Sequence, residues 1–190
     1  MRRFLPTLFL WLIALWLILP FIVVLGVSFN AEKNIAFPPS SLSLRWYGIL
    51  VTDTSWLIPI RNSVGIALAA SALSTSIALV ANFLLWRLNN SFMRAIIGLG
   101  VGPFLLPPVI LALGASIFWA EAGLYGRVEA TIISHGVFLV PLSLIIIGRG
   151  FALLSTDVIE ASRTLGANGA QTLRRVILPL VSPYIATGFA

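Results

Sequence analysis

The chain has 190 residues, of which 59% are hydrophobic and only 9% charged, with no cysteine and a single histidine. An apolar share this far above one half excludes an ordinary soluble domain, and the lack of cysteine excludes disulfides and thiolate metal sites. The net charge of +6 could indicate nucleic-acid binding, but the arginines stand between apolar runs. That spacing is typical of membrane proteins, so we expect no nucleic-acid partner and no bound metal.

The apolar runs predict an all-α fold, a polytopic bundle of transmembrane helices in one domain, 1–190. A spanning helix needs about 20 residues. Four runs meet or approach that length, at 4–27, 62–86, 95–120 and 130–148, and a fifth begins at 176 and is still apolar at 190. The fifth run is too short to span, so we expect the sequence to be truncated within a fifth helix. The first run is longer than a signal-peptide core, which favours a retained anchor helix.

The distribution of basic residues predicts the orientation. With the N-terminus inside, the segments 1–3, 87–94 and 149–175 face the cytoplasm and carry eight arginines. The outer segments 28–61 and 121–129 then carry four basic residues. Because cytoplasmic segments are enriched in Lys and Arg, we expect a cytoplasmic N-terminus.

Small residues predict where the helices pack closely. Ala70, Ser74, Ala78 and Asn82 recur every four residues in the second run, and Gly98 and Gly102 form a G-x-x-x-G at the start of the third. Small side chains at this spacing let helix backbones approach in lipid. Both sets are therefore expected at helix–helix contacts.

Pro107 and Pro108 predict a break in the third run, because each removes a backbone donor. Irregular backbone at membrane depth persists where protein or a water-filled cavity satisfies the freed carbonyls. Two interpretations stay open: a bend beside a translocation path, or an ordinary proline kink.

The membrane runs themselves argue against two function classes. They contain no Asp, Glu, Lys or Arg, whereas carriers driven by ion gradients place such groups within the membrane. His135 is the only histidine and fits a hydrogen-bonded packing role, and no nucleophile motif is present. We therefore expect a non-catalytic protein.

The polar stretch 157–179 predicts two short helices on the cytoplasmic surface. Asp157 and Glu160 have the spacing of a capping box, Gly166 is placed as a C-terminal cap, and Asn168 with Gln171 repeats the capping pattern. A second helix then continues into the fifth apolar run. Because a short exposed helix is marginal alone, it fits a partner's groove, although a capped loop without a partner stays open.

The stretch "EASRTLGANGAQTLRRVILP", residues 160–179, resembles the EAA motif of binding-protein-dependent ABC importer permeases. That motif reads E-A-A, three residues, G, nine residues, then I-x-L-P. Here Ser162 replaces the third-position alanine and Val176 replaces isoleucine, while Gly166 and Leu178-Pro179 match. The segments "SLRWY" and "PFLLPPVILALG" are similar to the spermidine/putrescine permease branch.

The resemblance implies a type I ABC importer permease in a bacterial cytoplasmic (inner) membrane. It implies three kinds of protein partner: ABC ATPase subunits, a second permease that is identical or homologous, and a periplasmic or lipid-anchored binding protein. Membrane lipid surrounds the bundle. ATP and Mg²⁺ would bind the ATPases, so no cofactor is expected in this chain.

The resemblance also assigns the loop 149–178 to ATPase coupling. The implied coupling residues are Glu160, Ala161, Ser162, Arg163, Leu165, Gly166, Ala167, Val176, Leu178 and Pro179. Pro107 and Pro108 are the candidate residues of the translocation path. A polyamine or similar small solute is the implied substrate; a secondary carrier or a membrane scaffold without ATP coupling is the alternative.

Overall fold

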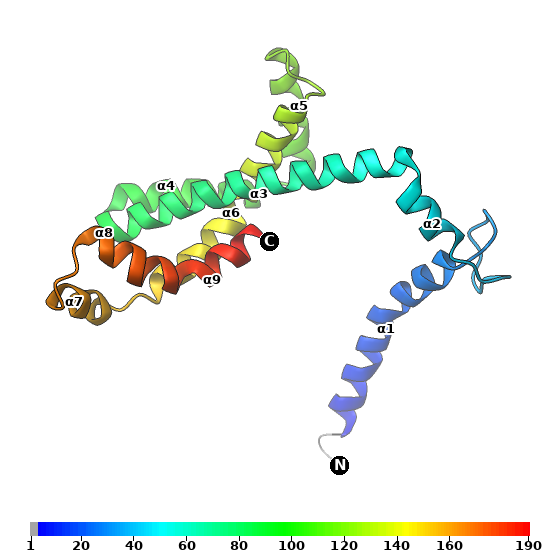
Figure 1. Cartoon of the computed structure of the whole chain (residues 1–190), viewed down its shortest axis with the longest axis horizontal. Helices are drawn as coiled ribbons and strands as arrows, with labels where there is room; N and C mark the ends of the chain where they lie inside the picture. Colours follow the sequence, from blue (N-terminus) through cyan, green and yellow to red (C-terminus); the bar gives the residue numbers. More distant parts are fainter. Residues whose placement is uncertain (1–3) are drawn as a thin grey trace. The chain divides into compact units, whose positions relative to one another are not determined.

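The computed structural model describes residues 4–190, and Figure 1 shows them as a chain of helices joined by loops, the longest of which lies between α1 and α2. The predicted all-α fold is confirmed. Arg2 and Arg3, two of the predicted cytoplasmic arginines, lie outside the described residues. The elements are α1 (Phe4–Ser28), α2 (Arg45–Thr52), α3 (Thr54–Leu88), α4 (Ser91–Val101), the 3₁₀ turn η1 (Gly102–Leu105), α5 (Pro108–Glu121), α6 (Val128–Ala152), α7 (Thr156–Thr164), α8 (Gly169–Thr172), the π-helical turn η2 (Leu173–Ile177) and α9 (Leu178–Phe189).

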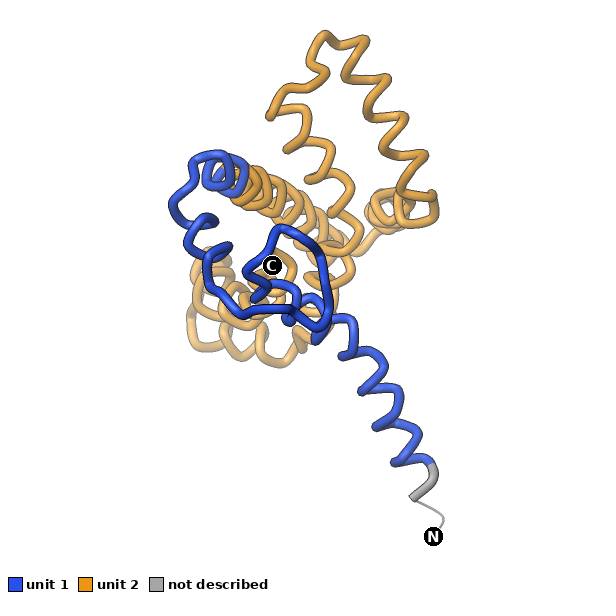
Figure 2. Tube along the Cα trace, turned by 90° about the vertical axis from the view of Figure 1, so that its right-hand side faces the viewer, with its two compact units in different colours: residues 1–61 blue, residues 62–190 orange. Residues whose placement is uncertain are grey.

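The chain divides into two compact units, residues 1–61 and 62–190 (Figure 2). In the first unit, the loop after α1 is held to α2 by side-chain hydrogen bonds. The Trp46 indole donates to the Asn30 carbonyl at 2.7 Å, and the Tyr47 and Ser28 hydroxyls are 2.7 Å apart. Asp53 precedes α3 and accepts from the Ser55 amide at 2.9 Å. Hydrogen bonds from the backbone and side chain of Ser55 lower the pKa of the Asp53 carboxyl.

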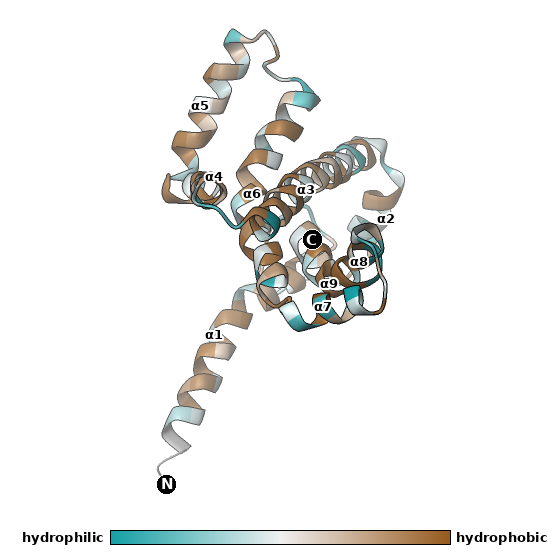
Figure 3. Ribbon diagram, turned by 90° about the vertical axis from the view of Figure 1, so that its left-hand side faces the viewer, coloured by the Kyte–Doolittle hydropathy of each residue, from teal (hydrophilic) through white to brown (hydrophobic). Residues whose placement is uncertain are grey.

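Three helices in the described chain are long and apolar enough to cross a membrane: Pro6–Ser28, Thr54–Leu88 and Val128–Ala152. A fourth candidate is the pair Ser91–Leu105 and Pro108–Glu121, which is bent by 104°. Figure 3 shows hydrophobic residues along α1, α5 and α6, in contrast to the hydrophilic residues on α7. The chain is thus a multi-pass membrane protein.

The predicted break at the proline pair is confirmed. Leu106 is extended, with φ −98° and ψ 142°, as expected for a residue before proline. Pro107 is also non-helical, and Pro108 is the first residue of α5. The first position of a helix tolerates proline because its N–H would have no intrahelical partner.

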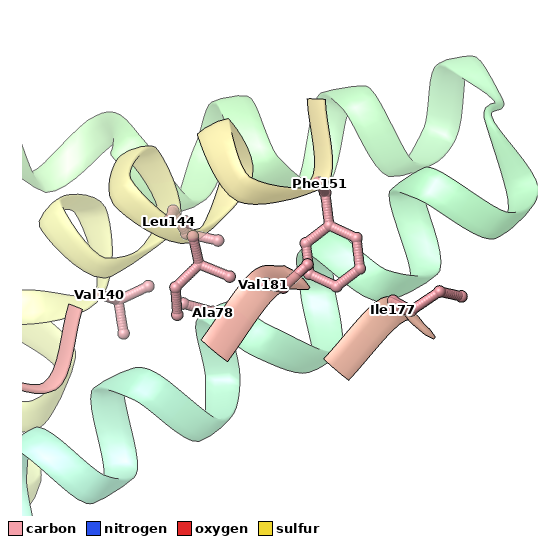
Figure 4. Packing of buried hydrophobic residues seen from close by; sticks show 7 residues of the cluster. Ala78, Val140, Leu144, Phe151, Ile177 and Val181 are labelled. Atoms are coloured by element: carbon pink, nitrogen blue, oxygen red, sulfur yellow. The ribbon is translucent and has the colours of Figure 1, made fainter. Parts of the chain in front are cut away.

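The core of the second unit lies between α3, α6 and α9 (Figure 4). Ala78 comes from α3, Leu144 from α6 and Val181 from α9, and all three are buried. The complete cluster is Ala78, Val140, Leu144, Ile147, Phe151, Ile177 and Val181. These three helices therefore form the packed body that carries the polar segment at its end.

Hydrogen bonds between helices reinforce this core. Ser143 Oγ donates to the Gly188 carbonyl at 3.0 Å and is 2.8 Å from Ser74 Oγ. Asn82 Nδ2 donates to two carbonyls, Ala78 at 2.9 Å and Leu144 at 3.1 Å. Such bonds connect α3 to α6 and α6 to α9 in a region where the hydrophobic effect gives little drive.

One of the two small-residue predictions is confirmed, and for the other the described residues contain no helix in contact. Ala70, Ser74, Ala78 and Asn82 are all buried. At Gly98 and Gly102, in contrast, no other helix of residues 4–190 comes within 4 Å of where a Cβ would stand. The close approaches occur at other glycines: a Cβ on Gly150 would lie 2.8 Å from Tyr184 Cδ2, between α6 and α9.

Candidate functional site

The polar segment folds as a short helix, a glycine turn and a second helix, as its sequence predicts, but its first cap differs from the prediction. Ser155, not Asp157, is the N-cap of α7, and its hydroxyl accepts from the Val158 amide at 3.4 Å. Asp157 lies inside the first turn, where a carboxylate favours the positive end of the helix dipole. The predicted Asp157–Glu160 capping box is therefore wrong, because the helix begins two residues earlier than that box requires.

The C-terminal cap of α7 is confirmed. Gly166 has a φ of +84°, a backbone conformation that residues other than glycine adopt only with strain. Its amide donates to the Arg163 carbonyl at 2.9 Å, and the Ala167 amide donates to the Ser162 carbonyl at 3.0 Å. This pair of bonds is the Schellman motif, which satisfies the last carbonyls of the helix.

The second predicted cap is also confirmed and starts a long helix. The Asn168 side chain accepts from the Gln171 amide at 3.0 Å, and the Gln171 side chain accepts from the Asn168 amide at 2.9 Å. From there α8, η2 and α9 follow without a break over 169–189. The π-helical turn η2 carries Arg174 and Arg175.

α7 is attached to this second helix on one face. Ile159 and Ser162, three residues apart, are its buried residues. The Ser162 hydroxyl donates to the Ile159 carbonyl at 2.7 Å and is 3.1 Å from the hydroxyl of Thr172, which is also buried. Sequence reasoning missed Thr172 and treated Ser162 as a mild departure from alanine. The only available signal was that a hydroxyl stands at a position where the motif has a methyl group.

Half of the predicted coupling residues lie on the open surface of α7 and its turn. Glu160, Ala161, Arg163, Leu165 and Gly166 are exposed, and the Leu165 side chain is 88% exposed. An apolar side chain so exposed beside two small residues is suited to contact with another protein. Ser162 differs from this set because it faces inward.

The remaining predicted coupling residues do not share that surface. Ala167 follows the turn and is half-buried. Val176 lies in η2 and Leu178 at the start of α9, and both are half-buried, whereas Pro179 is exposed. Pro107 and Pro108 lie at the α4–α5 break and are exposed. The structure therefore brings the motif's first half together as a surface and places its second half within the continuing helix.

A groove of about 430 Å³ runs between α7 and the end of α3. Its α3 wall is formed by Phe83, Trp86 and Arg87, and its α7 wall includes Glu160 and Arg163. The complete lining is Phe83, Trp86, Arg87, Leu154, Thr156, Ile159, Glu160, Arg163, Gly169, Thr172, Leu173 and Ile177. Phe83 and Trp86 also contact Phe151 of α6 in edge-to-face and tilted geometry, with ring centroids 6.4 Å and 6.3 Å apart.

The family model of the binding-protein-dependent transport system inner membrane component matches residues 75–190. The chain belongs to this family. The match covers α4 to α9, including α7 and its glycine turn, together with the C-terminal part of α3. Family membership supports the coarse assignment: a helical, multi-pass permease component of an ABC import system.

Several permease proteins are similar over most of the chain. The spermidine/putrescine transport system permease protein PotC of Haemophilus influenzae is 24% identical over 188 residues, 99% of this chain and 73% of the relative. PotC of Escherichia coli K12 is 23% identical over 174 residues, 92% of this chain and 66% of the relative. The probable ABC transporter permease protein y4fN of Sinorhizobium fredii is 27% identical, over 96% of this chain and 34% of the relative.

Proposed function

We propose that the chain is a permease subunit of an ATP-driven importer and that α7 with its glycine turn is the surface that contacts the ATPase. The observation that carries this proposal is the exposed face of α7, where Ala161, Leu165 and Gly166 lie together on a capped helix. An ATPase groove would take Leu165 as its apolar anchor. The small size of Ala161 and Gly166 would let the two backbones approach.

The contacts behind α7 supply a route for movement. When ATP binding closes the ATPase pair, α7 moves together with the ATPase groove that holds it. The Ser162–Thr172 hydrogen bond and the buried Ile159 connect α7 to the helix over 169–189. That helix packs along α6, where Gly150 meets Tyr184 and Ser143 bonds to Gly188. Displacement of α7 therefore tilts α9 against α6, and the bundle switches between two packings.

The π-helical turn η2 lies between the attached part of this helix and its membrane part, α9. Such turns are locally unwound and occur often at functional sites. In the proposed mechanism η2 lets α8 follow α7 while α9 keeps its contacts with α6. Pro107 and Pro108 form the second irregular point, and their break gives the α4–α5 segment a bend beside the translocation path.

The substrate assignment rests on relatives. Two of the similar permeases are named for spermidine/putrescine transport, and we propose a polyamine or a similar small cation as the solute. Uptake of labelled spermidine by cells that express the chain with its partner subunits tests this. We expect the labelled spermidine to accumulate in an ATP-dependent way, and we expect unlabelled putrescine to reduce that accumulation by competition. Uptake driven by an ion gradient without any ATPase would instead support a secondary carrier.

The ATPase contact is tested by co-purification from membranes that contain the partner subunits. Tagged chain should recover an ABC ATPase, and Glu160→Ala should reduce the recovery because the exposed carboxylate borders the proposed contact. Glu129→Ala is the matched control. Glu129 is an exposed acid of α6 that pairs with Arg127, and it lies away from α7. Equal recovery of the ATPase with both variants would count against a role for Glu160. Absence of any ATPase from the parent sample would reject the proposal.

A further inference from the structure

We propose that the groove between α3 and α7 binds the headgroup of an anionic phospholipid. The groove combines an apolar floor with a cationic rim. Phe83, Trp86, Leu154 and Ile177 supply the apolar surface, and Arg87 and Arg163 supply the charge. A glycerophospholipid has the same division, because its phosphate is negative and the adjoining acyl chains are apolar. Basic pockets between helices on the cytoplasmic side are suited to such headgroups.

The two arginines are available to a ligand. Arg87 and Arg163 come from different helices, and both side chains are exposed at the groove. Within residues 4–190, the one ion pair is that of Arg127 with Glu129. Neither groove arginine therefore has a carboxylate within 4 Å. A phosphate between them would receive two charge-assisted contacts from guanidinium groups, the side chains best matched to it.

The groove lies at the end of α3, a position that fits the lipid–water boundary. Trp86 and Arg87 lie in the last turns of a helix that is long and apolar enough to span. Tryptophan is enriched at that boundary, and arginine near a helix end reaches toward headgroups. The Trp86 side chain is half-buried against Phe83 and Phe151, so its ring is held in place at the groove wall.

Glu160 determines which headgroup fits. It is the acid in the groove lining, and with the two arginines it gives the groove a net charge of +1 (two positive, one negative). A headgroup with a single negative charge, such as phosphatidylglycerol, neutralises this charge. A zwitterionic headgroup leaves it uncompensated. We therefore commit to an anionic headgroup, and Glu160 should weaken rather than strengthen its binding.

Trp86 provides the measurement. The full chain is placed in nanodiscs that contain a small share of phosphatidylglycerol or phosphatidylcholine, each brominated at the headgroup end of its acyl chains. The contribution of Trp86 is the difference in fluorescence between the parent chain and the Trp86→Phe variant. We expect stronger quenching by brominated phosphatidylglycerol. Loss of both arginines, in Arg87→Gln with Arg163→Gln, should lower the apparent affinity about fivefold per arginine and remove the preference.

Two controls make the result specific. Arg174→Gln with Arg175→Gln removes the same charge from η2, outside the groove lining, and should keep the preference. Glu160→Gln should increase it. Equal quenching by both lipids, or a preference that survives loss of Arg87 and Arg163, would overturn the proposal. A preference for brominated phosphatidylcholine that Glu160→Gln reduces would overturn it in favour of a zwitterionic headgroup.

Discussion

At the scale of single residues, Gly166 is the position where backbone conformation and proposed function meet. Its φ of +84° closes the Schellman motif, and in the described part of the chain nothing beyond the adjacent residues lies within 4 Å of where its Cβ would stand. A side chain introduced at this position would therefore meet no steric obstacle in the chain, and the cost of substitution would come from the backbone conformation. The same open space is where an ATPase would approach.

Gly166→Val is expected to weaken both the turn and the ATPase contact. The left-handed conformation costs a residue with a side chain about 1–2 kcal/mol, and a β-branched one at least as much. We expect a lower unfolding temperature and reduced co-purification of the ATPase. Gly166→Asn, which tolerates this conformation better, should retain more of both. Recovery of the ATPase at the parental level with Gly166→Val would contradict the assigned role.

Ser162 is the second residue whose role depends on the structure. Ser162→Ala should remove its hydrogen bond to Thr172 and loosen α7 by about 1 kcal/mol, which corresponds to roughly fivefold faster amide exchange in α7. Hydrogen–deuterium exchange measures this. Thr164→Ala is the control, since that hydroxyl bonds only to the Glu160 carbonyl within α7 at 3.0 Å. Unchanged protection in Ser162→Ala would show that the hydrogen bond does not hold α7.

At the scale of elements, the contact between α6 and α9 transmits movement in the proposed mechanism. Gly150→Ala places a methyl group 2.8–3.0 Å from Tyr184 side-chain atoms and should destabilise the bundle by about 1–3 kcal/mol through overpacking. Unfolding in mixed micelles gives the free energy. Gly98→Ala would meet no other helix among residues 4–190 and should be neutral or slightly stabilising. Equal destabilisation by the two changes would argue against close α6–α9 packing.

The elements also show what the sequence could and could not predict. Local chemistry was sufficient for the Gly166 turn, the Asn168–Gln171 cap and the proline break, because each depends on a few adjacent residues. The small-residue face of α3 was predictable because burial follows the helical period. The partners of Ser162 and Gly150 were not predictable, because they lie on other helices. The Gly98–Gly102 face stays a prediction for a related reason, because residue spacing identifies a helix face but not the helix that covers it.

At the scale of the whole molecule, the orientation in the membrane is a prediction from the arginines. The chain contains no cysteine, so single cysteines can be labelled without a background. In intact spheroplasts a membrane-impermeant maleimide should label Ser40→Cys, in the predicted outer segment, and should leave Thr164→Cys unlabelled until the membrane is opened. Both positions are exposed in the structure. The reverse pattern would place α7 outside, where no ATPase could reach it.

The contact between α7 and an ATPase is the central claim, and site-specific photo-crosslinking tests it most directly. A photoreactive phenylalanine analogue replaces Leu165, which is 88% exposed on the proposed surface, or Leu105, which is 85% exposed in η1. Both variants are irradiated in membranes that contain the partner subunits, and adducts are identified by mass spectrometry. We predict an adduct with an ABC ATPase at position 165 and none at 105. No ATPase adduct at 165, or equal adducts at both positions, would contradict the proposed coupling surface.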